Sequence, residues 1–247
     1  MEPLIPIHSF DQKVLISGGT AGMGRATAQL LALAGGKLYV HGRREREMRE
    51  TVELITSKGG VAGGKTADAI DGSQVKDVFH AAEQFLGGLD TWIHCAAMGW
   101  SDDIDSDETD LEKALLTNLG SAICGSKEAA SRFKRMGKGN IILIGSMSAE
   151  VREARSSVYV ATKAGIRGLA AALRKELNPS GVGVYLIEPG ACDTDLSTAP
   201  AEERERMVKE QLMLVPQDVA EAVYFLLTRR AGCDVITLQI RPRMQLL

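Results

Sequence analysis

The 247-residue chain lacks a charge imbalance, a long apolar run and a secretory signal. Its 29 basic and 32 acidic residues give a formal net charge of −3 at pH 7, which argues against a strongly basic nucleic-acid binder or a polybasic membrane binder. No apolar run approaches the roughly 18–20 residues of a membrane-spanning helix. The start of the chain, MEPLIPIHSFDQK, has no basic region followed by an apolar one. We therefore expect a cytoplasmic protein that binds neither nucleic acid nor membrane.

The chain also lacks the cysteine spacing of a disulfide framework or a zinc site, so reduced thiols are the better explanation. A thiol next to the expected site would be reactive only if its pKa were lowered. Residues 101–110, SDDIDSDETD, hold six carboxylates, and a solvated loop explains them better than a metal site with fixed ligand geometry. We expect no metal. The four cysteines are Cys95, Cys124, Cys192 and Cys233.

No internal repeat or interdomain linker divides the chain. Hydrophobic residues make up 45% and charged residues 25%, as in ordinary globular proteins. This length often forms a single α/β domain. We expect a short N-terminal arm at residues 1–12 and one domain over residues 13–247.

Short apolar runs alternate with longer amphipathic stretches along the chain. The runs fall at residues 13–17, 37–41, 61–66, 89–94, 140–145, 182–187 and 234–240. The helix-like stretches fall near residues 23–34, 44–58, 73–86, 109–136, 157–177 and 217–229. Continuous apolar runs indicate strands that are buried on both faces. The alternation predicts an α/β fold, a doubly wound Rossmann-like domain with about seven parallel strands and helices on both faces.

The first run ends in a glycine-rich turn, SGGTAGMG at residues 17–24, and a helix pattern follows at once. A diphosphate needs close backbone approach, free N–H groups and a helix N-terminus for its negative charge. Glycine permits both the tight turn and the close approach. A plain strand-to-helix turn is the alternative, but the position after the first strand favours dinucleotide binding.

This turn resembles the TGxxxGxG motif of the short-chain dehydrogenase/reductase family, with Ser17 in place of threonine. The resemblance extends over about residues 13–240, and Pro189–Thr194 resembles the family's PGxxxT segment. It implies a nicotinamide dinucleotide cofactor and interconversion of a carbonyl and a secondary alcohol. The residues expected to hold the cofactor are Gly18, Thr20, Gly22, Met23, Gly24, Arg43, Asp68, Ala69, Ala96, Tyr159, Lys163, Pro189, Gly190 and Thr194.

Two arginines, Arg43 and Arg44, follow the second run. An NAD-selective site usually places a carboxylate near this strand end to bind the ribose hydroxyls, and residues 41–44 contain none. Guanidinium groups suit the 2′-phosphate of NADP, although a solvated helix start is the alternative. We favour NADP(H) over NAD(H), and Arg43 is the better candidate because it lies nearest the strand end.

The end of the third run matches the family's pattern, whereas the end of the fourth run departs from it. Asp68 matches the family's adenine-binding aspartate, with a helix N-cap as the alternative. The fourth run ends in His94, Cys95, Ala96 and Ala97, where the family usually has Asn-Asn-Ala-Gly. The small side chains still permit backbone approach. His94 replaces an asparagine that stabilises the sheet in the family, so we expect a structural role for it rather than proton transfer.

Ser146, Tyr159 and Lys163 are the expected catalytic residues. Ser146 follows the fifth run, and Tyr159 and Lys163 lie four residues apart on an expected helix, so their side chains share a face. Reduction of a carbonyl by hydride creates an alkoxide that needs a proton, which a tyrosine can supply when a neighbouring cation makes it more acidic. Lys163 would supply that charge and contact the nicotinamide ribose, and Ser146 would orient the substrate oxygen.

Asn118 matches the family's fourth catalytic residue, which holds a water in the proton path to the lysine. With Asn118, Ser146, Tyr159 and Lys163, all four catalytic positions are present. A catalytically silent protein of the same fold, which binds cofactor in a regulatory or scaffold role, is the alternative.

The resemblance also places the substrate, against residues that follow the fourth, fifth and sixth runs. Residues 196–215 resemble a short charged lid, which favours a small or medium carbonyl or alcohol substrate. The family implies a homo-oligomer, a tetramer or a dimer, through the helices near residues 109–136 and 157–177. The expected substrate contacts are Ser146, Met98 and Tyr159, with Trp100, Met147, Ser148, Glu150, Val151 and Leu196 as further candidates.

Overall fold

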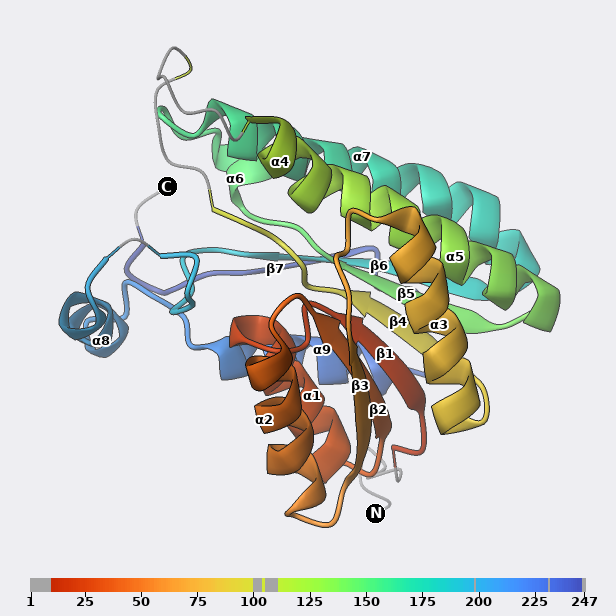
Figure 1. Cartoon of the computed structure of the whole chain (residues 1–247). Helices are drawn as coiled ribbons and strands as arrows, with labels where there is room; N and C mark the ends of the chain where they lie inside the picture. Colours follow the sequence, from red (N-terminus) through yellow and green to blue (C-terminus); the bar gives the residue numbers. More distant parts are fainter. Residues whose placement is uncertain (1–9, 100–103, 105–110, 198, 231, 246–247) are drawn as a thin grey trace, which may run out of the picture.

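Figure 1 shows the chain as a computed structural model. The structure describes residues 10–99, 104, 111–197, 199–230 and 232–245. Most of the expected N-terminal arm, the substrate candidate Trp100 and all but one residue of the acidic segment 101–110 lie outside the described residues.

The described residues form one seven-stranded sheet in the order β3-β2-β1-β4-β5-β6-β7. Every neighbouring pair of strands is parallel. This confirms the predicted doubly wound sheet. The strands are β1 Lys13–Ser17, β2 Lys37–Gly42, β3 Val61–Thr66, β4 Thr91–His94, β5 Gly139–Ile144, β6 Val182–Pro189 and β7 Thr237–Ile240.

Helices cover both faces of the sheet (Figure 1), as predicted. Figure 1 shows α4, α5 and α7 over one face and α1, α2 and α9 over the other. The helices are α1 Gly22–Leu33, α2 Glu45–Thr56, α3 Gly72–Leu86, α4 Leu111–Leu115, α5 Ser121–Met136, α6 Ser148–Val151, α7 Ser157–Leu177, α8 Ala201–Lys209 and α9 Pro216–Leu227, with a π-helical turn η1 at Leu116–Gly120 and a 3-10 turn η2 at Asn178–Ser180.

Each strand buries side chains on both faces because successive side chains point in opposite directions. In β1, Leu15 packs into the core beneath α3, α5 and α7. Val14 and Ile16 pack into the second core, with Leu31 of α1 and Val223 of α9. The continuous apolar run of β1 therefore follows from burial on both sides.

The fourth predicted strand, residues 89–94, is too long at its start, because β4 begins at Thr91. The carboxylate oxygen Oδ2 of Asp90 accepts a hydrogen bond from the backbone N–H of Lys13 at 3.0 Å. A side chain thus takes the first donor of β1, and the regular pairing of the two strands starts one residue later, with Val14 opposite Thr91.

The seventh predicted strand, residues 234–240, is also too long, because β7 begins at Thr237. Arg174 of α7 donates from Nη2 to the backbone oxygen of Ile236 at 2.6 Å. The same carbonyl also accepts a weaker hydrogen bond from the N–H of Leu186 in β6 at 3.4 Å, so Arg174 and β6 share it at the start of β7. The other predicted strands begin and end within two residues of the observed ones.

The strand order reverses between β1 and β4, because β1 pairs with β2 on one side and with β4 on the other. Helix α1, which follows β1, and helix α4, which follows β4, cover opposite faces of the sheet (Figure 1). Doubly wound sheets bind ligands in the crevice at this point, beyond the carboxyl ends of the strands. Of the described helices, none combines the length and the apolar character that a membrane span requires.

Candidate active site

A cavity of about 540 Å³ occupies this crevice. It lies between the glycine turn, the ends of β2, β3 and β4, and the segment after β6. Most of the residues predicted to hold a cofactor line it. They are Gly18, Thr20, Gly22, Met23, Gly24, Arg43, Asp68, Ala69, Ala96 and Thr194.

The glycine turn has the geometry that close packing requires. Gly18 has φ +74°, and a Cβ atom on it would lie 2.6 Å from the backbone nitrogen of Ala96. The loops after β1 and β4 therefore touch at this position, and the small residue at 96 permits it. A Cβ atom on Gly24 would collide with the carbonyl oxygen of Gly18.

Helix α1 begins inside this turn without a side-chain cap, since its N-cap residue is Ala21. The N–H groups of the first turn of a helix have no partner within the helix and carry a partial positive charge. The residues at this end, Gly22, Met23 and Gly24, line the cavity. The cavity thus offers backbone donors and space for a phosphate group, so these residues fit a dinucleotide.

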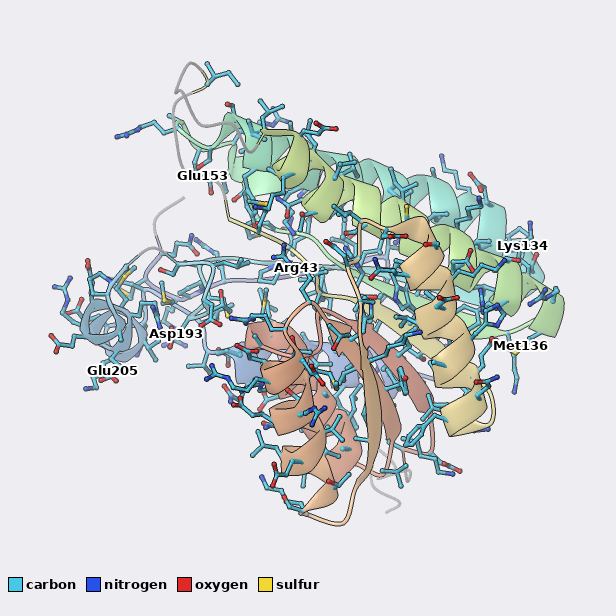
Figure 2. All side chains as sticks on the ribbon, in the orientation of Figure 1. Arg43, Lys134, Met136, Glu153, Asp193 and Glu205 are labelled. Carbon is cyan, nitrogen blue, oxygen red and sulfur yellow. The ribbon has the colours of Figure 1, made fainter. Side chains whose placement is uncertain are left out.

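Arg43 and Arg44 lie at the cavity with different partners. Arg44 forms an ion pair with Glu47 at 3.3 Å and a looser one with Asp195 at 3.9 Å. Arg43 is exposed, lines the cavity and forms no ion pair with a described residue. Figure 2 shows Arg43 between α2 and the layer of helices that contains α4 and α7.

Gly42, the last residue of β2, has no room for an acidic side chain. A Cβ atom there would lie 2.5 Å from Oγ1 of Thr20. A carboxylate at this strand end, the usual partner of the NAD ribose, would have to displace Thr20. The local packing therefore keeps the position free of negative charge, while Arg43 provides a positive one.

Asp68 lines the cavity and is not a helix cap, so the alternative interpretation of this residue is wrong. The N-cap of α3 is Asp71, whose Oδ1 accepts hydrogen bonds from the backbone N–H groups of Ser73 and Gln74 at 2.9 and 3.1 Å. Hydrogen bonds from Ser73 and Gln74 lower the pKa of Asp71 to about 2. The Asp68 carboxylate accepts one bond, from the N–H of Ile70 at 3.3 Å.

Tyr159 and Lys163 lie side by side on α7. The ammonium nitrogen of Lys163 is 5.5 Å from the centre of the Tyr159 ring, as expected for residues four apart on a helix. Lys163 is 3% exposed, and its Nζ donates to the carbonyl oxygen of Ile144 at 3.2 Å. Ile144 ends β5, two residues before Ser146. The lysine therefore connects the tyrosine to the strand end that carries the serine.

Ser146 is buried at 9% exposure and its hydroxyl lies in a short chain of polar groups. Its Oγ accepts a hydrogen bond from the backbone N–H of Ser148 at 3.2 Å and lies 3.1 Å from the Ser148 hydroxyl. The Ser148 hydroxyl donates to Oε1 of Glu153 at 3.1 Å. The backbone N–H of Met147 donates to the carbonyl oxygen of Pro189 at 2.9 Å, which holds the Ser146 loop against the end of β6.

Asn118 is fully buried in the π-helical turn η1. Its Oδ1 accepts from the backbone N–H of Met98 at 2.7 Å, and its Nδ2 donates to the Met98 carbonyl at 3.0 Å. The single helix predicted over residues 109–136 is therefore wrong in detail, because a wide turn separates α4 from α5. Such turns often occur at functional sites. Met98 lines the cavity, so Asn118 joins the cavity wall to the helical layer.

Met98 and Tyr159 pack against the same small apolar cluster. Both are partly buried, and the cluster consists of Ala114 and Val158. Because Met98 lines the cavity, this packing brings the tyrosine to the cavity's edge. The described residues that form the cavity wall do not include Ser146, Tyr159 or Lys163 themselves.

His94 is buried and electrically neutral. Burial, followed by the nearby charge of Lys163, lowers its pKa to about 3. Its Nε2 lies 3.2 Å from the hydroxyl of Ser121 on α5, so the ring joins β4 to the helix that covers it. This geometry fits the expected structural role.

The cysteine thiols near the site are unreactive. Burial raises the pKa of both Cys95 and Cys192 to about 12, so neither forms a thiolate readily at neutral pH. The structure contains four free cysteines. Among the described residues, no group of His, Cys, Asp or Glu side chains is placed to hold a metal ion.

Besides Tyr159 and Lys163, two more predicted cofactor residues, Pro189 and Gly190, do not line the cavity, although both are described. A Cβ atom on Gly190 would meet Pro242 at 3.0 Å, and the N–H of Gly190 donates to the carbonyl of Ile240 at 2.8 Å. Gly190 therefore packs beneath the C-terminal segment. Thr194, four residues later, reaches the cavity beside Gly22.

The predicted substrate residues do not all line the cavity. Leu196 lines the cavity. Met147 is buried at 7% exposure, and Glu150 forms an ion pair with Arg167. Trp100 lies outside the described residues. Within residues 196–215, the charged segment forms the exposed helix α8, which Figure 1 shows at the far side from α3.

Several cavity residues were not predicted as cofactor contacts. Those after β2, β3 and β4 lie beside predicted residues, and their position at the ends of strands could have identified them from the sequence. Thr117 and Asp195 reach the cavity only through tertiary packing. The residues are Ala21, His41, Gly42, Arg44, Ala67, Cys95, Ala97, Thr117 and Asp195.

Comparisons with known proteins agree on one family. The sequence profile of short chain dehydrogenases matches residues 12–205. An uncharacterised oxidoreductase of Staphylococcus aureus is 30% identical over 233 residues, which cover 94% of this chain and 97% of the relative. A 3-oxoacyl-(acyl-carrier-protein) reductase of Aquifex aeolicus is 29% identical over 226 residues, which cover 88% of this chain and 90% of the relative.

Solved structures agree with this assignment. A dehydrogenase/reductase from Sinorhizobium meliloti superimposes with a TM-score of 0.84 at 28% identity, over 96% of this chain and 97% of that one. A short-chain dehydrogenase/reductase from Serratia marcescens gives a TM-score of 0.84 at 25% identity, over 95% and 98% of the two chains.

Proposed function

The chain belongs to the short-chain dehydrogenase/reductase family and is an NAD(P)-dependent oxidoreductase that acts on CH–OH groups; from this premise we propose that it prefers NADP(H). We further propose that it interconverts a carbonyl and a secondary alcohol of small or medium size, with Tyr159 as general acid/base. The observation that carries the proposal is the placement of Lys163 beside the Tyr159 ring, with its ammonium bound to the carbonyl of Ile144 near Ser146.

The glycine turn and Arg43 would hold the cofactor. The N–H groups at the start of α1 would bind the diphosphate, and Asp68 would accept from the adenine amino group. Arg43, which has no other ion pair among the described residues, would bind the 2′-phosphate. A bound nicotinamide would supply or accept the hydride.

The protein's own groups would manage the substrate oxygen and its proton. In reduction, the Tyr159 hydroxyl would donate a proton to the oxygen of the former carbonyl, and in oxidation it would take that proton back. Ser146 would turn its hydroxyl from Ser148 toward the same oxygen and orient it. Lys163 would stabilise negative charge on the phenol oxygen, because its ammonium lies on the same side of α7.

Asn118 would hold the catalytic side chains in a fixed position relative to the cavity. Its two bonds to Met98 fix the loop after β4, and Met98 packs against the same apolar cluster as Tyr159. Such fixed geometry would favour a high turnover rate, because even a small misplacement of a reacting group slows the reaction. The water-holding role that the family assigns to this position remains part of the proposal.

Incubation of the protein with NADPH and a panel of ketones and aldehydes tests the proposal. Loss of the absorbance of reduced nicotinamide, dependent on both protein and carbonyl, is the expected result. Binding of NADPH without turnover across a wide panel would instead support the catalytically silent alternative. A parallel titration with NADPH and NADH, followed by cofactor fluorescence, tests the preference separately.

We also propose a cytoplasmic homo-oligomer, a dimer or a tetramer. The support is a set of exposed apolar side chains along α4, η1 and α5, which a second copy would cover. Light scattering of the purified protein gives the mass, and a monomer would contradict this part of the proposal. The side chains are Leu111, Leu115, Leu116 and Ile123, at 41, 39, 41 and 49% exposure.

A further inference from the structure

An ion pair between a buried carboxylate and a partly exposed guanidinium joins β6 to α7, the helix that carries Tyr159 and Lys163. Glu188, the last residue but one of β6, is 0% exposed. Arg167 of α7 donates to both of its carboxylate oxygens, from Nε at 2.8 Å and from Nη2 at 2.7 Å. This two-pronged geometry fixes the relative orientation of the two side chains. The pair therefore holds α7 and β6 in one arrangement.

Two more side chains extend the pair into a network. Nη2 of Arg167 also donates to Oε2 of Glu150 at 3.1 Å. Gln239 of β7 donates from Nε2 to Glu150 at 2.8 Å and to Glu188 at 3.0 Å. Hydrogen bonds from Gln239 and then Arg167 lower the pKa of Glu150. Four elements, α6, α7, β6 and β7, thus share one set of directional bonds.

Three of the four elements in this network, α6, α7 and β6, carry or adjoin a proposed catalytic group. Arg167 lies one helical turn after Lys163 on α7. Glu150 lies four residues after Ser146. The side chain of Glu188 covers Gly145, where a Cβ atom would lie 3.2 Å from Cγ of Glu188. The network consequently touches both sides of the Ser146 loop and the helix that carries the lysine.

Stability of the fold does not by itself account for the fully buried charge of Glu188. Removal of charges from water is costly, and apolar residues of similar volume often replace a buried pair with no loss of stability. Apolar side chains, however, supply no directional bonds between the four elements. The arrangement is therefore suited to fixing positions more than to adding stability.

We infer that Arg167 and Glu188 are positioning residues, which set the Ser146 loop against Lys163 and Tyr159. The inference rests on the proposed function, since it assumes the catalytic roles of those three residues. Neither Arg167 nor Glu188 lines the cavity, and their side-chain hydrogen bonds go to each other, Glu150 and Gln239. They act through Gly145, Glu150 and the first turns of α7.

The double variant R167M/E188M separates positioning from stability. The single variant R167M leaves the Glu188 carboxylate buried without its partner, so its melting temperature should fall. The double variant removes both charges and should recover most of that loss. Positioning predicts that kcat in the double variant stays about 10- to 100-fold below wild type while the KM for NADPH changes less than about twofold. Recovery of kcat together with the melting temperature would overturn the inference.

The variant R167K covers the case in which the double variant does not fold. Lysine keeps the positive charge but cannot form the paired bonds of a guanidinium group. We expect about a tenfold lower kcat at a nearly unchanged melting temperature. Wild-type kcat in R167K would overturn the inference.

Arg132 provides a control, because it is a more deeply buried arginine that also pairs with two carboxylates. It is buried at 5% exposure on α5 and pairs with Glu83 and Glu128. Figure 2 shows the neighbouring Lys134 and Met136 at the end of α5 far from Arg43. R132M should lower the melting temperature and leave kcat near wild type. An equal loss of kcat in R132M would show that any buried arginine has this effect, which would overturn the inference.

Hydrogen exchange gives a readout that needs no turnover. At equal melting temperature, backbone amides of residues 145–151 should exchange faster in R167M/E188M than in wild type. Unchanged exchange would overturn the inference. If wild type reduces no carbonyl, the proposed function fails, while the exchange measurement still decides whether the pair orders the Ser146 loop.

Discussion

Asn118 satisfies both backbone polar groups of Met98, accepting from its N–H at 2.7 Å and donating to its carbonyl at 3.0 Å. The two residues are 20 positions apart in the chain. Met98 belongs to the cavity wall and Asn118 to the helical layer that carries the catalytic groups. This one side chain therefore couples the proposed cofactor site to the proposed proton-transfer site.

Replacement of Asn118 by alanine should weaken both sites. The change leaves the Met98 N–H and carbonyl without their partners, which costs about 1–3 kcal/mol of unfolding free energy. It should also lower kcat. N118D keeps an acceptor for the N–H but places a second carboxylate oxygen against the Met98 carbonyl, so it should not restore wild-type behaviour. Chemical denaturation and steady-state kinetics measure both effects, and a fully active, fully stable N118A would contradict this role.

Gly24→Ala should disrupt the glycine turn. Its Cβ would collide with the carbonyl oxygen of Gly18, and overpacking of this kind costs about 1–3 kcal/mol. NADPH affinity should fall with stability because the same turn lines the cavity.

Gly168→Ala is the matched control for the glycine turn. Gly168 is exposed within α7, and a Cβ atom there meets no atom within 4 Å. Alanine should raise the unfolding free energy by about 0.5–1 kcal/mol. Calorimetry and cofactor titration compare the two variants, and equal behaviour would refute the packing argument.

Arg43→Ala should abolish the preference for NADPH over NADH. The guanidinium at the cavity is the group proposed to bind the 2′-phosphate, so its loss should weaken NADPH binding by about 10-fold or more and leave NADH binding nearly unchanged. Arg49→Ala serves as control, since Arg49 pairs with Glu45 on α2 and does not line the cavity. An unaltered NADPH/NADH ratio in the Arg43 variant would exclude Arg43 as the selector.

The fold and much of the cavity could be predicted from the sequence because their signals are local. The glycine turn at residues 17–24 needs glycine for contacts that the backbone itself imposes. Arg43 follows a strand end, and parallel strands all end on the ligand side of the sheet. Tyr159 and Lys163 share a helix face through spacing alone.

The remaining features depend on contacts between distant segments. Residues 116–120, LTNLG, contain nothing that forbids a regular helix, and the wide turn there coincides with the bonds of Asn118 to Met98. Glu188 ends an apolar run, and its partner Arg167 lies 21 residues earlier. The sequence pattern places Glu188 at the end of a strand and Arg167 in a helix. It cannot show that the two side chains contact each other.

His94 should make the protein less stable in mild acid. Its pKa in the folded protein is about 3, below the ordinary histidine value of 6.5. Between these values the unfolded chain binds a proton that the folded protein does not, so stability falls as the pH falls. The contribution is about 1.4 kcal/mol per pH unit for one histidine.

His94→Asn removes the imidazole that takes up this proton in the unfolded chain, while it keeps a polar side chain beside Ser121. The variant's unfolding free energy should fall less steeply than that of wild type from about pH 6 to about pH 4. Urea denaturation at several pH values in this range gives the two slopes. Parallel slopes would mean that His94 does not titrate as a buried, neutral group.

The most direct test of the proposed chemistry is the turnover of Tyr159→Phe. Phenylalanine keeps the ring that packs against Ala114 and Val158 and adjoins Lys163 but removes the hydroxyl. With a carbonyl that wild type reduces, kcat should fall by about 10²–10⁴, while the dissociation constant for NADPH stays within about twofold of wild type. A variant that turns over at nearly the wild-type rate would contradict the assignment of Tyr159 as the proton donor.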